Sequence, residues 1–193
     1  YRLGQTLQVK LNEMGIFILD ELFNAKKEDI LSIKGISEKT YNQWINQIIS
    51  LKEDKPFILI KPNIKTAKTE IFFDIEGDPD MGIDYLYGLL IDDKFIYFWA
   101  DTPEKEELMW KEFIKFIEST DDIVLYHYSS YEKTSINRLA EKFGIKEETY
   151  KKIIDSMVDL FPILTKSVVM PLYSYSIKPV AKYLHFKWRA DDA

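Results

Sequence analysis

The sequence contains no cysteine, which excludes disulfide bonds, thiolate metal sites and cysteine nucleophiles. It also lacks a signal-peptide pattern and any long apolar stretch that is free of charge. The 193 residues, 46% of them hydrophobic, are enough to bury a core. We therefore expect a soluble, cytoplasmic protein that folds as one large domain or as a medium domain with a small one.

Positive charge is scarce in the second part of the chain. The formal net charge is -6, but residues 1–69 carry 11 Lys and Arg against 8 Asp and Glu, and residues 70–193 carry 15 against 24. The first part therefore has a net charge of +3 and the second of -9. A basic module can bind phosphate while an acidic one holds metal. We predict a helical module at 1–50, a basic linker at 51–69 and an α/β domain at 70–193.

Residues 1–50 are expected to form short helices joined by glycine turns. Gly15 and Gly35 each follow an apolar pattern of helical period, and Ser37 can cap the last helix. The pattern resembles a helix-hairpin-helix DNA-binding module, in which backbone N–H groups approach a phosphate. The resemblance implies nucleic-acid contacts from Lys34, Gly35, Ile36 and Lys39. Ser37 stands where that module has its second glycine, and a plain packing unit of helices is the alternative.

The linker at 51–69 contains five lysines around Pro56 and Pro62, and residues 57–60 can form a short strand. These lysines are either a solvated connector or a basic track that leads toward the acidic part of the chain.

The most informative stretch is the apolar run at residues 72–79, which ends in carboxylates. Side chains two residues apart on a strand share one face, so Asp74 and Glu76 can point together while Ile75 turns to the core. Two such carboxylates can hold the divalent ions used in phosphoryl transfer. Gly77 and Pro79 are expected to break the strand, and a strand-end turn with solvated acids is the alternative.

The pattern downstream predicts two more strands, a helix, a fourth strand and a second helix. The runs at 85–91 and 95–100 predict a meander with the carboxylate strand, and residues 123–126 predict a buried strand. Apolar positions of helical period mark the first helix by Trp110, Phe113, Ile114 and Ile117, and the second by Ile136, Leu139, Ala140 and Phe143. The order βββαβα, with acids at the end of the first strand, predicts a ribonuclease H-like mixed sheet flanked by helices.

The chain resembles the DEDD exonuclease superfamily, and most closely the uncharacterised ribonuclease H-like domain that accompanies RecB-like nucleases. The matching stretches are residues 73–79, 126–132, 158–160, 175–178 and 183–186. The resemblance implies a nuclease that uses two Mg²⁺ or Mn²⁺ ions, with Asp74 and Glu76 as its first motif. Glu132 occupies the position at which most relatives carry a second catalytic Asp. The implied partner is nucleic acid, DNA rather than RNA, and nuclease or helicase domains can be attached in a longer protein.

Three further residues near these motifs have two interpretations each. Glu132 is either a metal ligand or the second half of a capping box that begins at Ser129. His127 and Tyr131 are expected to contact nucleic acid, and a structural histidine is the alternative for His127. Asp159 is a supporting residue or a helix cap first, and a metal ligand second.

The carboxyl end departs from the DEDD pattern, which requires a final Asp on a late helix. Asp191 and Asp192 lie in a stretch without helical period. We expect the closing helix and its Asp to be absent from residues 70–193, which would truncate the domain at its carboxyl end. The sequence favours a metal-dependent nuclease of the 3′ to 5′ exonuclease type, and without that Asp this chain is expected to bind metal but to cleave poorly. The alternative is a catalytically incomplete nucleic-acid-binding or assembly module of the same fold.

Overall fold

The computed structural model describes residues 4–187, which form two compact units. The first unit combines residues 4–61 with 165–187, and the second comprises residues 62–164. None of the helices in these described stretches has the length and apolarity needed to cross a membrane.

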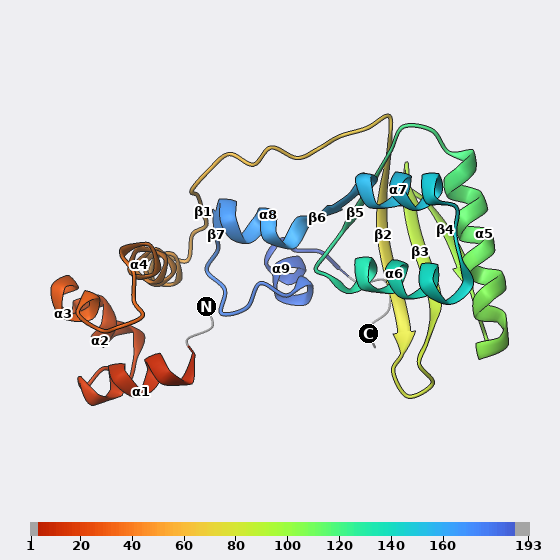
Figure 1. Cartoon of the computed structure of the whole chain (residues 1–193). Helices are drawn as coiled ribbons and strands as arrows, with labels where there is room; N and C mark the ends of the chain where they lie inside the picture. The colour runs from red at the N-terminus through yellow and green to blue at the C-terminus, as the bar shows by residue number, and fades with distance from the viewer. Residues whose placement is uncertain (1–3, 188–193) are drawn as a thin grey trace. The chain divides into compact units, whose positions relative to one another are not determined.

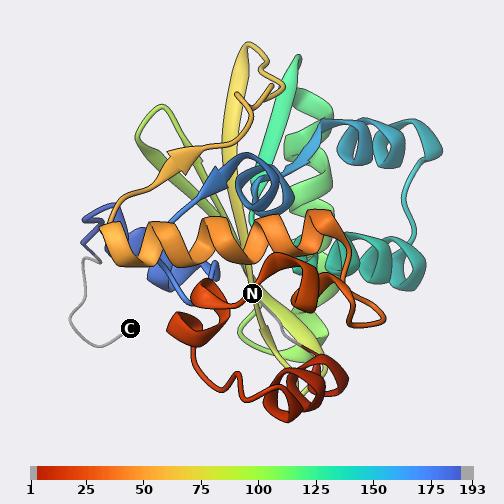
Figure 2. The ribbon, with the colours of Figure 1, turned by 90° about the vertical axis from the view of Figure 1, so that its left-hand side faces the viewer.

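The first unit begins with four helices, α1 (Gln5–Glu13), α2 (Leu19–Asn24), α3 (Lys27–Leu31) and α4 (Glu38–Glu53). Helices α1 to α3 lie on one side of the long helix α4 (Figure 2). As predicted, Ser37 caps α4, because its hydroxyl accepts a hydrogen bond from Thr40 N at 3.1 Å. The small core consists of apolar side chains from all four helices and their connections, namely Leu11, Ile16, Leu22, Ile30, Ile33, Ile36, Trp44 and Ile48.

Residues 165–187 complete the first unit rather than the second. Strand β1 (Phe57–Ile58) pairs antiparallel with β7 (Val168–Val169), and helix α9 (Ile177–Tyr183) follows. The buried amide of Gln47 donates to the carbonyls of Met170 and Leu172 at 2.8 and 3.0 Å. Its oxygen accepts a hydrogen bond from Tyr175 Oη at 2.9 Å. Burial of an amide with its hydrogen bonds satisfied ties this segment firmly to α4.

The second unit contains a five-stranded sheet of β2 (Thr69–Asp78), β3 (Ile83–Ile91), β4 (Lys94–Trp99), β5 (Ile123–His127) and β6 (Met157–Asp159). The order is β4-β3-β2-β5-β6, with β2 to β4 antiparallel and β5 and β6 parallel to β2. The predicted meander is confirmed. Asp92 and Asp93 make its second turn with φ values of 47° and 64°, the left-handed conformation that a two-residue hairpin turn of this hand requires.

Helices α5 (Glu106–Ser119), α6 (Tyr131–Phe143) and α7 (Glu147–Ser156) pack on one face of this sheet (Figure 1). A 3₁₀ turn at Pro103–Lys105 precedes α5, and Gly144, at φ 78°, ends α6. The shared core joins inward side chains of β2, β3 and β5 to those of the helices, including Phe73, Tyr87, Trp110, Phe113, Ile136, Leu139 and Ile153. The predicted α/β fold, a ribonuclease H-like mixed sheet flanked by helices, is confirmed.

The expectation that Gly77 breaks the carboxylate strand is wrong. β2 continues to Asp78 and pairs with β3 beyond a bulge between Glu76 and Gly77. The chain turns only afterwards, where the Asp78 side chain accepts hydrogen bonds from the backbone N–H groups of Asp80 and Met81 at 2.9 and 3.0 Å. The bulge absorbs one extra residue without ending the strand.

Candidate active site

Asp74 and Glu76 lie on the outer face of β2, as the sequence predicts. Residues Ile71, Phe73 and Ile75 are buried on the inner face, and the two carboxylates alternate with them on the solvent side. Because neighbouring positions on one face of a strand are close, the two carboxylates stand next to each other. Within residues 4–187, neither side chain forms an ion pair with Lys or Arg.

The negative charges of Glu76 and Glu132 both act on Asp74. Partial burial raises the pKa of Asp74 above its usual value, and the charges of Glu76 and Glu132 raise it further. A hydrogen bond from the Ile75 backbone opposes these effects. Three carboxylates from β2 and α6 therefore share one electrostatic environment, although they are separated in the sequence.

Glu132 is buried in the first turn of α6 and faces His127 at the end of β5. Its Oε2 lies 3.3 Å from Nδ1 of His127, and both side chains are 4% exposed. The same Nδ1 lies 2.8 Å from the carbonyl oxygen of Ser129. A carbonyl oxygen can only accept, so Nδ1 carries a hydrogen. His127 is buried, and its ring contacts Glu132 from the interior of the domain. The expected contact of His127 with nucleic acid does not fit this buried position.

The alternative interpretation of Ser129 and Glu132 as a capping box is wrong. The N–H of Ser129 donates to Oδ1 of Asp159 at 2.8 Å, and Ser130 is the residue that precedes α6. Ser129 has a φ of 87°, a left-handed conformation that is unfavourable for serine and is held here by its neighbours. Glu132 is thus released from a capping role and directed toward His127.

Asp159 has the helix-cap role that the sequence analysis placed first. Its Oδ1 accepts hydrogen bonds from Ser129 N at 2.8 Å and from Phe161 N, in the first turn of α8 (Leu160–Ser167), at 2.9 Å. The same oxygen therefore fixes both the turn after β5 and the start of a helix. Asp159 stabilises the loop that carries α6 into position.

A buried polar network that the sequence did not reveal joins β3 to α6. The Asp84 carboxylate, 2% exposed, accepts hydrogen bonds from the hydroxyls of Ser135 and Tyr131, the latter at 3.0 Å. The hydroxyl of Tyr87 bonds Ser135 at 2.9 Å. Burial raises the pKa of Tyr87 well above its ordinary value, and the charge of Asp84 adds to this effect.

Glu106, at the start of α5, extends this network and is completely buried. It accepts hydrogen bonds from Arg138 at 2.9 Å, from Lys142 at 2.6 Å and from the N–H of Asp84 at 2.8 Å. Arg138 also pairs with Asp84 at 2.8 Å. Sequence periodicity could not find these partners, because they lie 22 to 36 positions from Glu106. The network fixes α6, and therefore Glu132, relative to the sheet.

Tyr131 joins the network to the carboxylate strand. A Cβ atom at residue 77 would collide with the Tyr131 hydroxyl, so Gly77 provides the space that this hydroxyl occupies. Burial, followed by the charge of Asp84 and its hydrogen bond, raises the pKa of Tyr131 to about 12. About half of Tyr131 remains exposed, and the charge of Glu76 acts on its hydroxyl. The expected contact of Tyr131 with nucleic acid stays a prediction.

The other residues that were expected to bind nucleic acid belong to the first unit. Lys34 and Lys39 are exposed, Gly35 has a φ of 105°, and Ile36 is buried in the small core. Lys10 Nζ in α1 donates to the Lys34 carbonyl at 2.9 Å, which links α1 to the turn at Gly35. Asp191 and Asp192, the candidates for a final carboxylate, lie outside the described residues.

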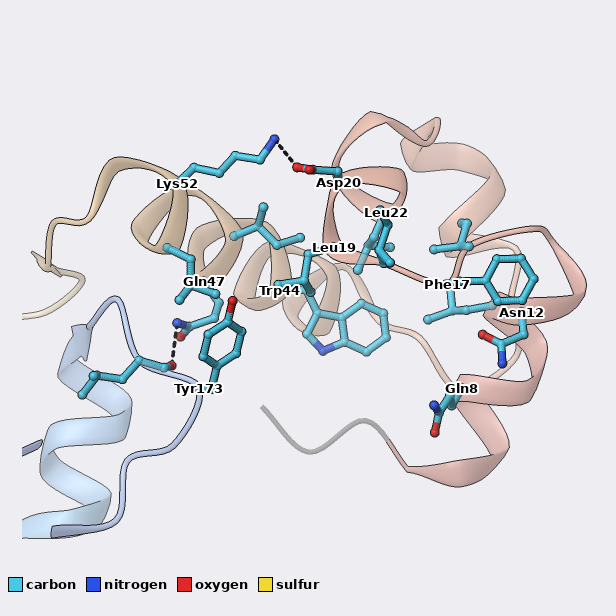
Figure 3. Close-up of a pocket in the computed structure, with 16 residues that line it drawn as sticks. Gln8, Asn12, Phe17, Leu19, Asp20, Leu22, Trp44, Gln47, Lys52 and Tyr173 are labelled. Atoms are coloured by element: carbon cyan, nitrogen blue, oxygen red, sulfur yellow. Dashed lines mark hydrogen bonds and ion pairs between the residues drawn. The ribbon is translucent and has the colours of Figure 1, made fainter. Parts of the chain in front are cut away.

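A cavity of about 700 Å³ also lies in the first unit, and no carboxylate pair lines it (Figure 3). Apolar side chains dominate its wall, and Lys52 and Asp20 form an ion pair at 2.6 Å at its rim. Its lining includes Phe17, Leu19, Trp44 and Tyr173. Asp74 and Glu76 do not line this cavity and are exposed on the outer face of β2.

The donor chemistry of Asp74 and Glu76 suits a hard divalent cation such as Mg²⁺ or Mn²⁺. Within residues 4–187, no three His, Asp or Glu side chains are grouped so that they could hold a metal ion. The two carboxylates of β2 are consequently the ligands that fit, while Glu132 is engaged by His127. A complete two-metal site is not assembled by these residues alone.

Comparison with known proteins agrees with the fold. The family model of the RNase H superfamily matches residues 71–193, and no curated protein matches the chain. The matched range begins within β2 and includes Asp74, Glu76, Glu132 and Asp159. Membership of this superfamily suggests a nuclease-like activity and binding of nucleic acid. The chain belongs to the RNase H superfamily.

Proposed function

We propose that this chain is a metal-dependent nuclease domain that hydrolyses phosphodiester bonds, of the 3′ to 5′ exonuclease type. The observation that carries the proposal is the pair Asp74 and Glu76, which share the outer face of β2 and lack a Lys or Arg counter-ion within residues 4–187. Like charges held together without a counter-ion favour binding of a cation. The RNase H superfamily fold supplies the context in which such a pair acts on nucleic acid.

A divalent cation at this pair would polarise the phosphate and lower the pKa of an attacking water. The chain's own residues would bind the cation and hold the side chains around it in position. Asp74 and Glu76 would hold the cation, and Glu132, backed by His127, would keep a third negative charge beside Asp74. The network around Asp84 and Glu106 would keep α6 in place during this chemistry.

A second candidate function is a catalytically incomplete module that binds nucleic acid without turnover. One observation favours it, namely that the described residues contain no group of three metal-binding side chains. Two-metal hydrolysis needs further carboxylates to seat the second ion.

The two functions are separated by incubating the full chain with 5′-labelled single-stranded DNA or RNA and Mn²⁺. The variants are Asp74→Asn and, as a matched loss of one exposed carboxylate, Asp93→Asn in the β3–β4 turn. Stepwise shortening from the 3′ end that persists in Asp93→Asn and falls at least about a hundredfold in Asp74→Asn supports the nuclease. Mn²⁺ binding without digestion supports the second candidate, and digestion that survives Asp74→Asn contradicts the site.

A further inference from the structure

The outer face of β4 carries three exposed aromatic side chains in a row. Phe95, Tyr97 and Trp99 are 63%, 61% and 50% exposed and occupy alternate positions of the strand. Phe72 and Leu90 add exposed apolar surface on β2 and β3. Soluble proteins rarely leave large aromatic side chains clustered in water without a binding role. We call Phe95, Tyr97 and Trp99 the β4 aromatic surface.

Sheet register places this surface beside the carboxylate pair. Asp74 pairs with Gly88, and Gly88 pairs with Tyr97. In the next row on the same face, Glu76 pairs with Leu86, and Leu86 with Trp99. Two strand spacings separate each acid from its aromatic partner, about 10 Å. A stacked single strand of nucleic acid spans that distance in about three nucleotides.

Gly88, which lies between Asp74 and Tyr97, has no side chain, so the ring of Phe95 can cover β3 next to Asp74. A Cβ atom at residue 88 would lie 3.2 and 3.3 Å from two carbon atoms of the Phe95 ring, closer than ordinary contact. The ring of Phe95 therefore lies over the glycine, and its centroid is 6.0 Å from that of Tyr97 with an angle of 22° between the planes. The two rings are nearly parallel, and the ring of Phe95 extends from β4 over β3, next to the carboxylate strand.

We propose that the β4 aromatic surface stacks the unpaired bases of a single-stranded nucleic acid whose backbone passes the carboxylate pair. The statement that this backbone passes the carboxylate pair rests on the nuclease function proposed above. Aromatic side chains bind bases through their π-faces with little dependence on sequence. A double helix is excluded as the occupant, because its base faces are covered by their neighbours.

The charge of this face disfavours an acidic protein ligand and offers no cation to the phosphates of a nucleic acid. The outward positions of β2, β3 and β4 carry the acids Glu70, Asp74 and Glu76 on β2, apolar side chains or glycine on β3, and aromatic rings on β4. None of these outward positions is Lys or Arg. Stacking, rather than phosphate neutralisation, must then supply the affinity of this surface. Binding here should be weakly dependent on salt.

The test measures anisotropy of a labelled oligothymidylate of about 12 nucleotides with the full chain. Ca²⁺, which also takes oxygen ligands, is used in place of Mn²⁺. Tyr97→Ala should weaken binding about 5- to 150-fold, the range for losing one stacked base. Tyr97→Phe should retain it, and Tyr97→Leu, which is apolar but not planar, should behave like alanine. Tyr173→Ala is the matched control, because Tyr173 is 80% exposed on the other unit.

Three binding results would overturn the inference. They are equal affinity of wild type and Tyr97→Ala, full affinity of Tyr97→Leu, and equal binding of the oligothymidylate and its duplex. An altered oligomeric mass for Tyr97→Ala would also contradict it, by showing that a second copy of the chain covers this face. The proposed nuclease function is tested separately, by the digestion assay with Asp74→Asn. If that function fails, an affinity for the oligothymidylate that depends on Tyr97 would still support the stacking surface.

Discussion

The hydroxyl of Tyr131 donates to Oδ1 of Asp84 at 3.0 Å and fills the space into which a side chain at residue 77 would project. One contact thereby connects the bulge of β2, the buried end of β3 and the first residue of α6. Because Glu132 follows Tyr131 directly, this contact determines where the third carboxylate lies relative to Asp74.

The first prediction concerns Gly77→Ala. The added methyl group must displace the Tyr131 hydroxyl and breaks its hydrogen bond to Asp84, so we expect a loss of about 1–3 kcal/mol in unfolding free energy. Tyr131→Phe removes the hydroxyl, so in this background Gly77→Ala should cause a smaller loss of unfolding free energy. Chemical denaturation of both single variants and the double variant measures the coupling. Strictly additive losses would show that the two residues do not compete for this space.

Glu106 should make the second unit sensitive to acid. Burial alone would raise the pKa of Glu106, but hydrogen bonds from Lys142, the Asp84 N–H and Arg138 outweigh burial and hold the pKa below its usual value. A lowered pKa in the folded state means that the stabilisation is present above the unfolded value, about 4.3, and is lost as pH falls through the folded value.

Glu106→Gln should therefore lower the unfolding free energy at pH 7 by about 3 kcal/mol, the lower end for breaking a buried ion pair, since Arg138 and Lys142 keep contact with solvent. The difference from wild type should shrink as pH is lowered below about 4. Urea denaturation at several pH values measures it. A difference that is independent of pH would contradict the proposed ionisation.

Asp159→Ala tests whether this residue is a cap or a metal ligand. Loss of the hydrogen bonds to Ser129 and Phe161 should cost about 1–2 kcal/mol, the usual range for an N-cap. Thermal unfolding measures this loss, and calorimetric titration should show unchanged Mn²⁺ affinity. A loss of Mn²⁺ affinity as large as that of Asp74→Asn would make Asp159 a ligand.

The sequence predicted those features that are encoded locally. The alternation of Ile71, Phe73 and Ile75 with Asp74 and Glu76 is sufficient to place both acids on one face, because strand period depends only on neighbouring residues. Helical period likewise identified the buried stripes of α5 and α6.

The features that were missed depend on contacts between distant residues. Nothing in the sequence near Glu106 or Arg138 distinguishes them from solvated helix residues, and only folding brings them to Asp84. The capping box is absent for a related reason. The N–H of Ser129 donates to Asp159, which is 30 positions away, and not to Glu132. The two-residue pairing of β1 with β7 is too short for any periodic signal.

The helical module remains the predicted anchor for DNA. Lys34→Glu with Lys39→Glu in the full chain should weaken binding of a DNA oligonucleotide and flatten the slope of log K against log salt by about 0.7 to 0.9 for each lost phosphate contact. Lys151→Glu with Lys166→Glu is the matched control, because both lysines are exposed and lie far from the glycine turns in the sequence. An unchanged slope in the first variant would remove these lysines from the interface.

The Asp74→Asn variant should be more stable than wild type without metal. The raised pKa of Asp74 means that its charged form is disfavoured in the folded state, so its contribution to stability declines as pH rises through the folded value. Removing the charge should raise the melting temperature near pH 7, and this gain should vanish below about pH 4. An equal gain in Asp93→Asn would show that general charge reduction is the cause, and not burial of the Asp74 charge with repulsion from Glu76 and Glu132.

The central claim, that Asp74 and Glu76 together bind a divalent cation, is tested most directly by melting temperature as a function of Mn²⁺ concentration. Binding to the folded state adds RT ln(1 + [L]/Kd) to the unfolding free energy, so the melting temperature of wild type and Asp93→Asn should rise with Mn²⁺. In Asp74→Asn, and in the double variant Asp74→Asn, Glu76→Gln, this rise should disappear. The same Mn²⁺-dependent rise in the double variant would contradict the account.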